Sequence, residues 1–566
     1  MRKADLVLLH PPSIFDFRER PRLWGPINDL VPSTHIFEMY PLGFVSLASQ
    51  LGCRGYNVRI INLALKMLRS KKFEVERYLK GLKTEVFGID LHWLPHVHGS
   101  IELARKLKEI HPDVPIIFGG ISSTYYYREI LEKVDAVDYV LLGDSTEMPM
   151  VKLMEELNNG RKFQEVPNLA WRSEGKIKVN PLSYVPEDLR DFKLDYGVLF
   201  KASHRFPTLT DPLPYDDFID HPIMPVIVQK GCRYNCATCG GSRYSYDKFM
   251  NRQRVAFRSP EEILDDILTI EEMRSPCFIC GDLLGLGRRR MERTLNLIKQ
   301  EKIDVPVIFE MFTPAPRWYF EAISSSVDRF SVEISPESGD EAVRRVQGRK
   351  YSDSALYKTI NHAFEKGCEK LDVFFMIGLS GETRESLDNT MAMCQRLIDM
   401  DGKGRIFPFI APYAPFLDPG SLAFDYPEHY GFKSHCRSLM DHYNLLDSSV
   451  SWKDFLSYET TSFSKDDIVD ATYACALRLA EMKGRAGIFD EEQLKTLKHR
   501  INISQETMSE LERRGDKKGF LDSEAIKDIF TGTDDSVVSD RSELRWLSKP
   551  KLLRYLALLK FHVKNL

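Results

Sequence analysis

The chain has 566 residues, of which 43% are apolar and 28% charged, and its formal net charge is −4. These values are typical of a globular protein with a full core, and the small negative charge argues against general binding of nucleic acid. The length favours roughly three to four domains. Ten mostly scattered cysteines favour a reducing compartment over a disulfide framework. The first residues reach two prolines too early for a signal peptide, and no stretch approaches the roughly 20 apolar residues of a membrane span, so we expect a cytoplasmic protein.

Short apolar strands alternate with amphipathic helices over residues 1–159, which we expect to form the first domain. The strands expected are residues 5–10, 57–63, 86–91, 115–120 and 138–143, with helices between them such as 42–51 and 99–110. This alternation predicts an α/β, doubly wound, Rossmann-like domain whose parallel sheet is covered on both faces. Ligands of such sheets bind outside the carboxyl ends of the strands. That rim carries His10, Asp90 to Trp93, Gly119 to Ser123, and Gly143 to Ser145.

The run VPIIFGGISST resembles the fourth-strand segment of cobalamin-binding domains, in which a Gly-Gly pair lets the backbone approach the nucleotide tail of the cofactor. The usual D-x-H-x-x-G motif of that family, whose histidine ligates cobalt, belongs after the first strand, where this chain has HPPSIFDF. Asp90 and His92 form a near match, but they follow the third strand, so we do not assign His92 as a cobalt ligand. The resemblance implies cobalamin contacts at Asp90, His92, Gly119, Gly120 and Ser122. The alternative is a vestigial domain that shapes a substrate cavity.

Three histidines, His92, His96 and His98, lie in the same strand-end segment. A metal site is one interpretation, but histidines in such a loop more often form a polar rim or the start of a helix, which we favour. Residues 160–221, which follow this domain, are rich in proline and charge and predict a small hairpin and an extended linker.

The strand and helix alternation restarts in residues 222–420. Strands are expected at 225–232, 277–282, 306–312, 329–335, 370–378 and 405–412, with helical patterns between them. Six such units predict a partial (β/α)6, TIM-like barrel, in which reactive residues lie at the carboxyl ends of the strands.

Cys232, Cys236 and Cys239 follow the first of these strands in the spacing C-x3-C-x2-C. Three thiolates can hold three irons of a [4Fe–4S] cluster, and no fourth cysteine follows at ligand spacing, so one iron stays open to a small molecule. This loop resembles the radical SAM superfamily, in which the open iron chelates S-adenosylmethionine (SAM). A zinc knuckle or three buried thiols are the alternatives. Thr238 stands where the superfamily usually has an aromatic residue over the adenine, so Tyr234 or backbone groups are expected to replace that contact.

Three further segments resemble SAM-binding motifs of the same superfamily. Gly281 and Asp282 resemble the G-G-E motif. Glu333, Ser335 and Glu337 have the strand spacing of residues on one face, which in a barrel would be the lumen. Gly378 and Gly381 lie in FFMIGLSGET, which is similar to a G-x-P-G-E-T segment. Helix capping is the alternative for Ser338, Asp340, Glu382 and Thr383. Arg344 and Arg349 are either partners of the SAM carboxylate or solvated. Cys277, Cys280 and the scattered cysteines Cys53, Cys368, Cys394, Cys436 and Cys475 are expected in the core.

The far end of the chain, residues 421–566, has mainly helical patterns and ends in LRWLSKPKLLRYLALLKFHVKNL. This basic, amphipathic tail either lies on an anionic membrane surface or docks on the barrel with its lysines in water. The run FPFIAPYAPFLDPGS before it either lines a substrate cleft or closes the barrel.

The order of the domains resembles the cobalamin-binding radical SAM enzymes. The resemblance implies that a reduced cluster, fed by a ferredoxin or flavodoxin, cleaves SAM to methionine and a 5′-deoxyadenosyl radical, and that methylcobalamin methylates an unactivated carbon. The alternative within enzymes is radical C–C coupling, ring formation or rearrangement without cobalamin, on a lipid or another small molecule. A non-catalytic iron–sulfur scaffold or sensor is a distant alternative. The sequence selects no substrate.

Overall fold

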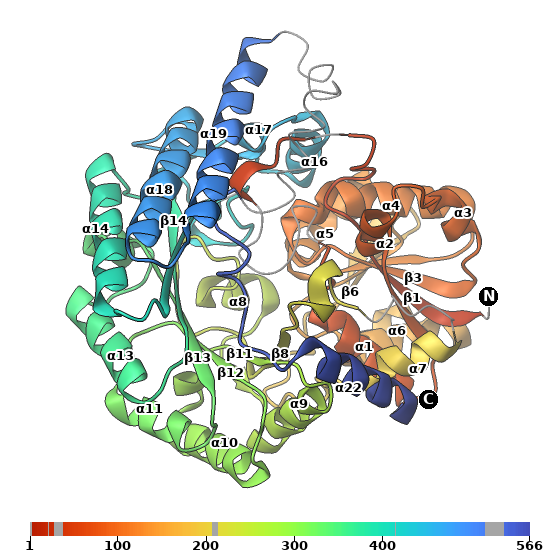
Figure 1. Ribbon diagram of the computed structural model, residues 1–566. Helices are drawn as coiled ribbons and strands as arrows, with labels where there is room; N and C mark the ends of the chain where they lie inside the picture. The colour runs from red at the N-terminus through yellow and green to blue at the C-terminus, as the bar shows by residue number, and fades with distance from the viewer. Residues whose placement is uncertain are drawn as a thin grey trace.

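Two β-sheets lie side by side in the computed structural model (Figure 1). The structure describes residues 3–20, 22–27, 38–205, 213–413, 415–514 and 537–565. The first sheet, drawn in red and orange, belongs to the N-terminal part, and the second, drawn in green and cyan, belongs to the barrel. The α/β class and the order of a doubly wound domain, a partial barrel and a helical C-terminal region are therefore confirmed.

The first sheet has the order β2-β1-β3-β4-β5-β6-β7, and its first five strands pair in parallel. Its strands are β1 (Ala4–His10), β2 (Val58–Asn62), β3 (Thr84–Asp90), β4 (Ile116–Gly119), β5 (Tyr139–Leu141), β6 (Leu169–Ser173) and β7 (Lys176–Val179). Its helices are α1 (Leu42–Gly52), α2 (Leu63–Arg69), α3 (Val75–Lys80), α4 (Val97–Ile110), α5 (Ile121–Lys133) and α6 (Glu147–Asn159). Strands β1 and β3 are almost wholly buried, because helices cover both faces of the sheet.

The hairpin expected within residues 160–221 is β6–β7, and it joins the first sheet antiparallel to β5. After it the chain forms α7 (Gly197–Arg205) and the short η4 (Asp216–Ile219), which lead to the barrel.

The second sheet has the order β15-β14-β13-β12-β11-β8, and every neighbouring pair is parallel. Its strands are β8 (Met224–Ile227), β11 (Cys277–Cys280), β12 (Val307–Met311), β13 (Phe330–Glu337), β14 (Leu371–Ile377) and β15 (Ile406–Pro412). Its helices are α8 (Arg243–Met250), α9 (Pro260–Glu272), α10 (Arg288–Glu301), α11 (Arg317–Ser324), α12 (Glu341–Val346), α13 (Asp353–Glu365) and α14 (Arg384–Met400). A short pair, β9 (Gln229–Lys230) and β10 (Ala256–Phe257), stands at its edge. Six parallel strands are the predicted partial barrel.

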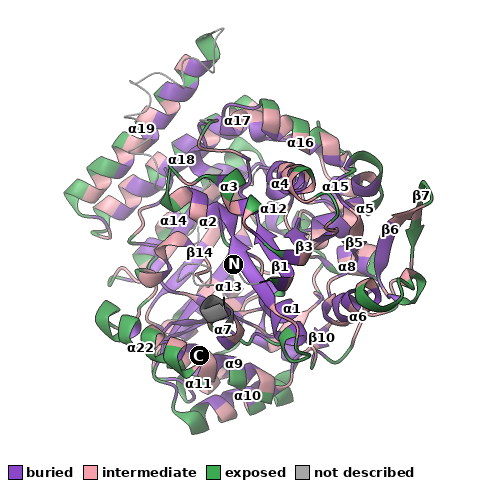
Figure 2. Ribbon diagram, turned by 90° about the vertical axis from the view of Figure 1, so that its right-hand side faces the viewer, coloured by how far each residue is buried: buried purple, intermediate pink, exposed green. Residues whose placement is uncertain are grey.

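The C-terminal region packs against the barrel. Its elements are α15 (Leu422–Asp425), β16 (Phe432–Ser434), α16 (Leu439–Ser448), α17 (Trp452–Phe455), β17 (Tyr458–Thr460), α18 (Lys465–Arg485), α19 (Glu491–Arg513) and α22 (Lys551–Lys564). Helix α18 contacts β15 and α14, and Figure 2 shows buried and exposed faces alternating along these helices. The helical pattern expected up to residue 531 lies outside the described residues from 515 onward.

The basic tail is docked on the body of the protein. Helix α22 contacts α7, α9 and η4, with Phe561 buried. Lys549, Lys551 and Lys564 form ion pairs with acidic side chains of the body, Asp304, Asp220 and Glu272. The docking alternative is therefore confirmed: Lys551 and Lys564 pair with the body while 62% and 65% of their side chains stay exposed to water, and exposed apolar side chains lie on the same helix. No helix among the described residues is long and apolar enough to cross a membrane.

Candidate active site at the mouth of the barrel

The three-cysteine loop leaves the barrel directly after β8 and β9. Backbone amides point at two of the thiols: the N–H of Tyr234 donates to Cys232 Sγ at 3.4 Å, and the N–H of Gly241 donates to Cys239 Sγ at 3.3 Å. Burial raises the pKa of the Cys232 and Cys236 thiols, and the nearby Arg349 guanidinium acts in the opposite direction. Amide donors and a buried cation are what three thiolate ligands need to remain ionised.

The spacing of the sulfur atoms distinguishes the metal centres that the loop can hold. The Sγ atoms of Cys232, Cys236 and Cys239 do not all lie within 4.8 Å of one another. Three thiolates on one zinc ion, with bonds of about 2.3 Å, would lie closer together than this. Three thiolates that each ligate a different iron of a [4Fe–4S] cluster need no such close spacing, so the loop matches the predicted cluster better than the zinc-knuckle alternative.

Gly281 and Asp282 lie beside this loop. Asp282 is almost fully buried, caps η5 (Leu283–Leu286) by accepting from the Leu284 N–H at 2.9 Å, and accepts from the Tyr234 hydroxyl at 3.2 Å. The Gly281 N–H donates to Glu310 Oε2 at 2.6 Å. The carboxyl group of Asp282 therefore fixes an aromatic side chain of the cysteine loop, and both residues stand at the carboxyl end of β11.

Glu333 and Ser335 face the barrel lumen as expected, but Glu337 does not continue that surface. The pairing of β13 with β14 shifts in register between Ile334 and Glu337, and Glu337 has a positive φ of 71°. An extra residue at a bulge redirects the side chains beyond it. Glu337 instead accepts from Arg349 Nη2 at 2.8 Å, and Gly348 packs against the backbone of Cys236.

Arg344 and Arg349 are both buried, so the alternative of solvated positions is wrong. Arg344 pairs with Asp353 and donates to the Ser338 carbonyl at 3.0 Å. Asp340 caps α12, as the capping alternative predicted, through the N–H groups of Ala342 and Val343. Only Arg349 of the two arginines reaches the neighbourhood of the cysteine loop.

The two glycines after β14 have different surroundings. Gly378 has φ of 88°, and a Cβ atom there would lie 2.6 Å from the Tyr458 hydroxyl, so its close approach is to that ring. A Cβ atom on Gly381 would meet nothing within 4 Å. Glu382 is fully buried and accepts from the Gly378 N–H at 2.6 Å, whereas Thr383 caps α14. Burial raises the pKa of Glu382 to about 8, although hydrogen bonds from the Gly378 and Leu379 backbone N–H groups act to lower it.

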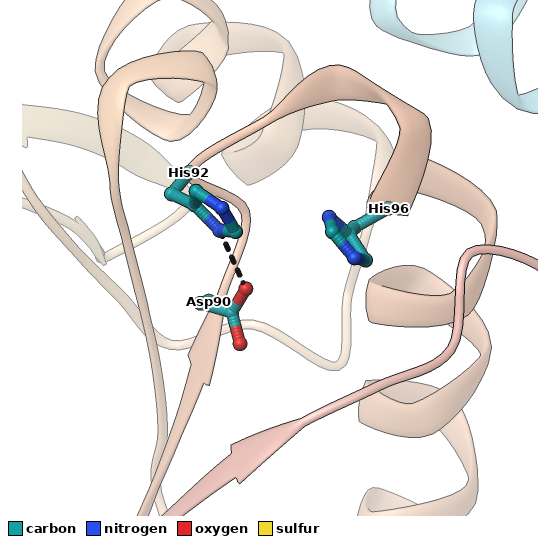
Figure 3. A group of neighbouring side chains, drawn as sticks. All are labelled: Asp90, His92 and His96. Atoms are coloured by element: carbon teal, nitrogen blue, oxygen red, sulfur yellow. Dashed lines mark hydrogen bonds and ion pairs between the residues drawn. The ribbon is translucent and has the colours of Figure 1, made fainter. Parts of the chain in front are cut away.

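At the rim of the first sheet, Asp90, His92 and His96 come together (Figure 3). Their nearest ligand atoms all lie within 4.8 Å of one another, and His92 Nδ1 is 2.8 Å from Asp90 Oδ2. His10 Nδ1 lies 3.0 Å from the same carboxylate. Burial disfavours the ionised form of Asp90, but His10 and His92 outweigh it and hold its pKa well below the usual range.

Of the three histidines grouped from the sequence, His92, His96 and His98, only His92 and His96 lie together in the structure. His98 lies apart from His92 and His96: its Nδ1 accepts from the Phe15 N–H at 3.2 Å, and its Nε2 lies 3.3 Å from Asp447 Oδ1. His10, from the first strand, takes its place beside Asp90.

The Gly-Gly pair after β4 serves two purposes. A Cβ atom on Gly120, which has φ of 113°, would lie 2.4 Å from His92 Cα, so this glycine permits the turn to pack on the β3 loop. A Cβ atom on Gly119 would meet nothing within 4 Å, which leaves open space at the rim. Ser122 Oγ lies 3.5 Å from the His92 carbonyl. An open rim beside Gly119 fits the backbone approach that a cobalamin tail requires.

A cavity of about 870 Å³ joins the two sheets. His92, Trp93 and Ile121 line it from the rim of the first sheet, and Cys280, Glu333 and Ser335 line it from the barrel. Cys280 was expected in the core but lines this cavity. Cys53 was also expected in the core but is exposed, whereas the other scattered cysteines are buried as expected. The wall residue Asp372 was missed, although a charged residue inside the apolar run KLDVFFMIG was the signal for it.

Two family models match the chain. The B12 binding domain model matches residues 33–151, and the Radical SAM superfamily model matches residues 226–394. Together they span about half of the chain.

Individual relatives agree with these matches. An uncharacterised methyltransferase, PH0819, of Pyrococcus horikoshii is 22% identical over 68% of this chain and 78% of that protein. The anaerobic magnesium-protoporphyrin IX monomethyl ester cyclase of Rubrivivax gelatinosus is 22% identical over 63% of this chain and 62% of its own length. The radical SAM methyltransferase TsrM of Kitasatospora setae, solved with cobalamin and a [4Fe–4S] cluster, has the same fold, with a TM-score of 0.59 at 12% identity over 88% of this chain and 95% of that one.

The barrel and its three-cysteine loop define the class, a radical SAM enzyme. More narrowly, the chain belongs to the radical SAM enzymes that carry a B12 binding domain. Its cofactors are accordingly a [4Fe–4S] cluster, SAM and cobalamin.

Proposed function

We propose that this enzyme methylates an unactivated carbon of its substrate in a cobalamin-dependent reaction. The observation that carries the proposal is the cavity that opens to the rim of the B12 binding domain at His92 and to the barrel at Cys280 and Glu333. A methyl donor at one wall and a radical generator at the other would then act on one bound molecule, and such proximity supplies much of the rate. When bound, the cluster and SAM supply the radical that abstracts hydrogen, and cobalamin supplies the methyl group.

The residues proposed to hold the cluster are Cys232, Cys236 and Cys239, since all three leave one loop at the barrel mouth. Arg349 keeps a positive charge beside Cys236, which favours the ionised thiols. Tyr234, held by Asp282, is the aromatic side chain nearest in sequence to the loop's first cysteine and is proposed to replace the missing contact at Thr238.

For SAM we propose the contacts named from the sequence: Gly281, Asp282, Glu333, Ser335, Glu337, Gly378 and Gly381. Their positions support unequal roles. Asp282 and Glu337 are already engaged with Tyr234 and Arg349, so they would position those side chains rather than bind SAM through free carboxylates. Glu333 and Ser335 face the cavity directly.

For cobalamin we propose Asp90, His92, Gly119, Gly120 and Ser122. The Asp90 carboxylate orients the His92 ring through Nδ1, and His92 also lines the cavity. Gly119 leaves the open space at the rim. Gly120 and Ser122 then act by holding the loop that carries His92.

The proposed partners are a ferredoxin or flavodoxin, because the cluster needs one electron for each SAM cleaved, and a membrane surface. The support for membrane contact is the outer face of α22, where Leu552, Leu556 and Leu559 are about half exposed or more. Lys551 and Lys564 of this helix are paired with the body, so the attraction would come more from apolar contact than from charge.

The test of the function is anaerobic reconstitution of the full chain with iron, sulfide, hydroxocobalamin and SAM, followed by reduction. Methyl transfer predicts 5′-deoxyadenosine together with S-adenosylhomocysteine, and cobalamin that stays with the protein on gel filtration. A Cys236→Ala variant should lose both products, whereas Cys277→Ala, at a buried cysteine of β11, should keep them. A reconstituted protein that cleaves no SAM would support the scaffold alternative and contradict the proposal.

Ring formation is the second candidate, and the similarity to the magnesium-protoporphyrin IX monomethyl ester cyclase favours it. It predicts 5′-deoxyadenosine without S-adenosylhomocysteine, so the same assay separates the two reactions.

A further inference from the structure

The wall of the interdomain cavity is mostly apolar. One part of it is formed by large apolar side chains of α7, η4, the barrel and the C-terminal segment, and α7 and η4 also contact α1, β2 and α2 of the first domain. These side chains are Leu199, Phe200, Phe218, Phe278, Phe374 and Trp546. No lysine or arginine lines the cavity among the described residues. A phosphate or carboxylate in this part would therefore find no opposite charge and would be poorly solvated.

In the described part of the chain, the cavity wall has two acidic side chains, Asp372 and Glu333. Asp372 Oδ2 accepts from Lys370 Nζ at 2.8 Å, whereas its buried Oδ1 has no hydrogen-bond partner among the described residues. Glu333 faces the cavity on the neighbouring strand. Burial, and then the nearby Glu310, raise the pKa of Glu333 well above its usual value. Two acidic side chains in an otherwise mostly apolar wall disfavour an anion, whereas a hydroxyl group, which both donates and accepts, suits them.

The apolar wall continues to the surface of the molecule. Phe200 lines the cavity and packs edge to face on Phe561 of α22, with ring centroids 5.2 Å apart. The opposite face of α22 exposes Leu552, Leu556 and Val563. Most of the large exposed apolar side chains of the described protein lie on this helix or next to it. Packed apolar side chains therefore connect the cavity wall at Phe200 with α22 through Phe561.

We propose that this apolar part of the cavity binds a long, uncharged hydrocarbon chain whose single polar group is a hydroxyl beside Asp372, with Glu333 left to SAM as proposed above. The inference rests on the proposed function, whose substrate class it names. The whole cavity, which also adjoins the proposed cofactor sites, has about 870 Å³, within the roughly 300–1,000 Å³ of pockets that enclose most of a drug-sized molecule.

The experiment measures binding of Nile red, a neutral apolar fluorophore, to the reconstituted full chain, and its displacement by linear alcohols from octanol to dodecanol. Each added methylene should tighten displacement by up to about fourfold. The matching fatty acids, with a carboxylate at the same end, should displace the probe at least tenfold more weakly. Equal displacement by alcohols and acids, or no dependence on chain length, would overturn the proposal.

Variants locate the bound probe. Ala411→Phe adds a ring at a wall position of β15 and should weaken binding about tenfold or more, and Phe278→Asn, which removes apolar wall on β11, should also weaken it. Ala322→Phe, the same change at a partly buried position of α11 away from the wall, should leave binding unchanged. Unfolding curves exclude variants that fail to fold. Unaltered binding in both folded wall variants would contradict the assignment.

Hydroxocobalamin separates the two parts of the cavity. Nile red should remain bound when the B12 binding domain is loaded, because the probe lies against the apolar wall around Phe278 and Phe374 rather than at the rim beside His92. Complete displacement of Nile red by hydroxocobalamin would assign the whole cavity to the cofactor and contradict the inference. Failure of probe binding in a protein that still forms S-adenosylhomocysteine would remove the substrate class and leave the proposed function intact.

Discussion

Individual buried carboxyl groups of the barrel have different partners, and these partners decide what each carboxyl does. Glu337 is neutralised by Arg349 and Asp282 is held by Tyr234, whereas Glu382 has only two backbone amides. The second oxygen of Glu382 has no hydrogen-bond partner among the described residues. A carboxyl group without a cation is buried at lower cost when it is protonated.

Because Glu382 is buried without a cation, we expect the free energy of unfolding to depend on pH through this residue. Its pKa is raised from 4.5 to about 8 in the folded state, so its contribution is fully present below about pH 4.5 and is lost as the pH rises to about 8. Relative to Glu382→Gln, which stays neutral, the wild type should lose roughly 3–5 kcal/mol of unfolding free energy across that window. Denaturant titrations of both proteins between pH 5 and pH 9 measure the difference. Parallel curves across the window would contradict it.

At the scale of an element, α22 exposes large apolar side chains together with its lysines. Lys551 and Lys564 turn toward Asp220 and Glu272 on the body, while leucines face outward. A soluble helix normally buries its apolar stripe, and exposed apolar patches mark interaction sites. The face is therefore suited to an apolar surface, and its paired lysines contribute little to attraction by anionic lipids.

The triple change Leu552→Ser, Leu556→Ser and Leu559→Ser tests this face. Binding to vesicles of neutral phosphatidylcholine should fall at least tenfold, because the apolar area that would enter the interface is removed. The unfolding free energy should change by less than about 0.5 kcal/mol per site, as is usual for exposed positions. Co-sedimentation with vesicles measures binding, and Lys560→Ser serves as the control with no expected effect. Binding only to anionic vesicles, abolished by salt, would show that charge drives it instead.

At the scale of the whole molecule, the two sheets are joined by buried ion pairs around the β5–α6 loop. Arg252 of the barrel pairs with Asp144, and Lys230 pairs with Glu147 at 2.9 Å. The side chains of the first pair are 2% and 6% exposed, so each would be an uncompensated buried charge without the other. These contacts hold the rim of the first sheet against the mouth of the barrel and so enclose the cavity.

Arg252→Met should destabilise the folded chain by about 3–5 kcal/mol, because it leaves Asp144 buried and unpaired. The loss should be concentrated at the interface, so limited proteolysis should cleave the connecting segment 180–196 faster than in the wild type. The double variant Arg252→Met, Asp144→Leu removes both charges and should recover much of the stability. Equal destabilisation of the single and double variants would show that the ion pair does not hold the interface.

The sequence alone determined the two sheets, the cysteine loop and the order of the domains, because these depend on local patterns: apolar runs of strand length, cysteine spacing and glycine pairs. Tertiary structure decided which polar residues meet. The bulge in β13 turned Glu337 toward Arg349, His10 rather than His98 joined Asp90, and Asp372 reached the cavity from a neighbouring strand. Register shifts and contacts between distant segments set these positions, and side-chain period and spacing along one strand do not encode them.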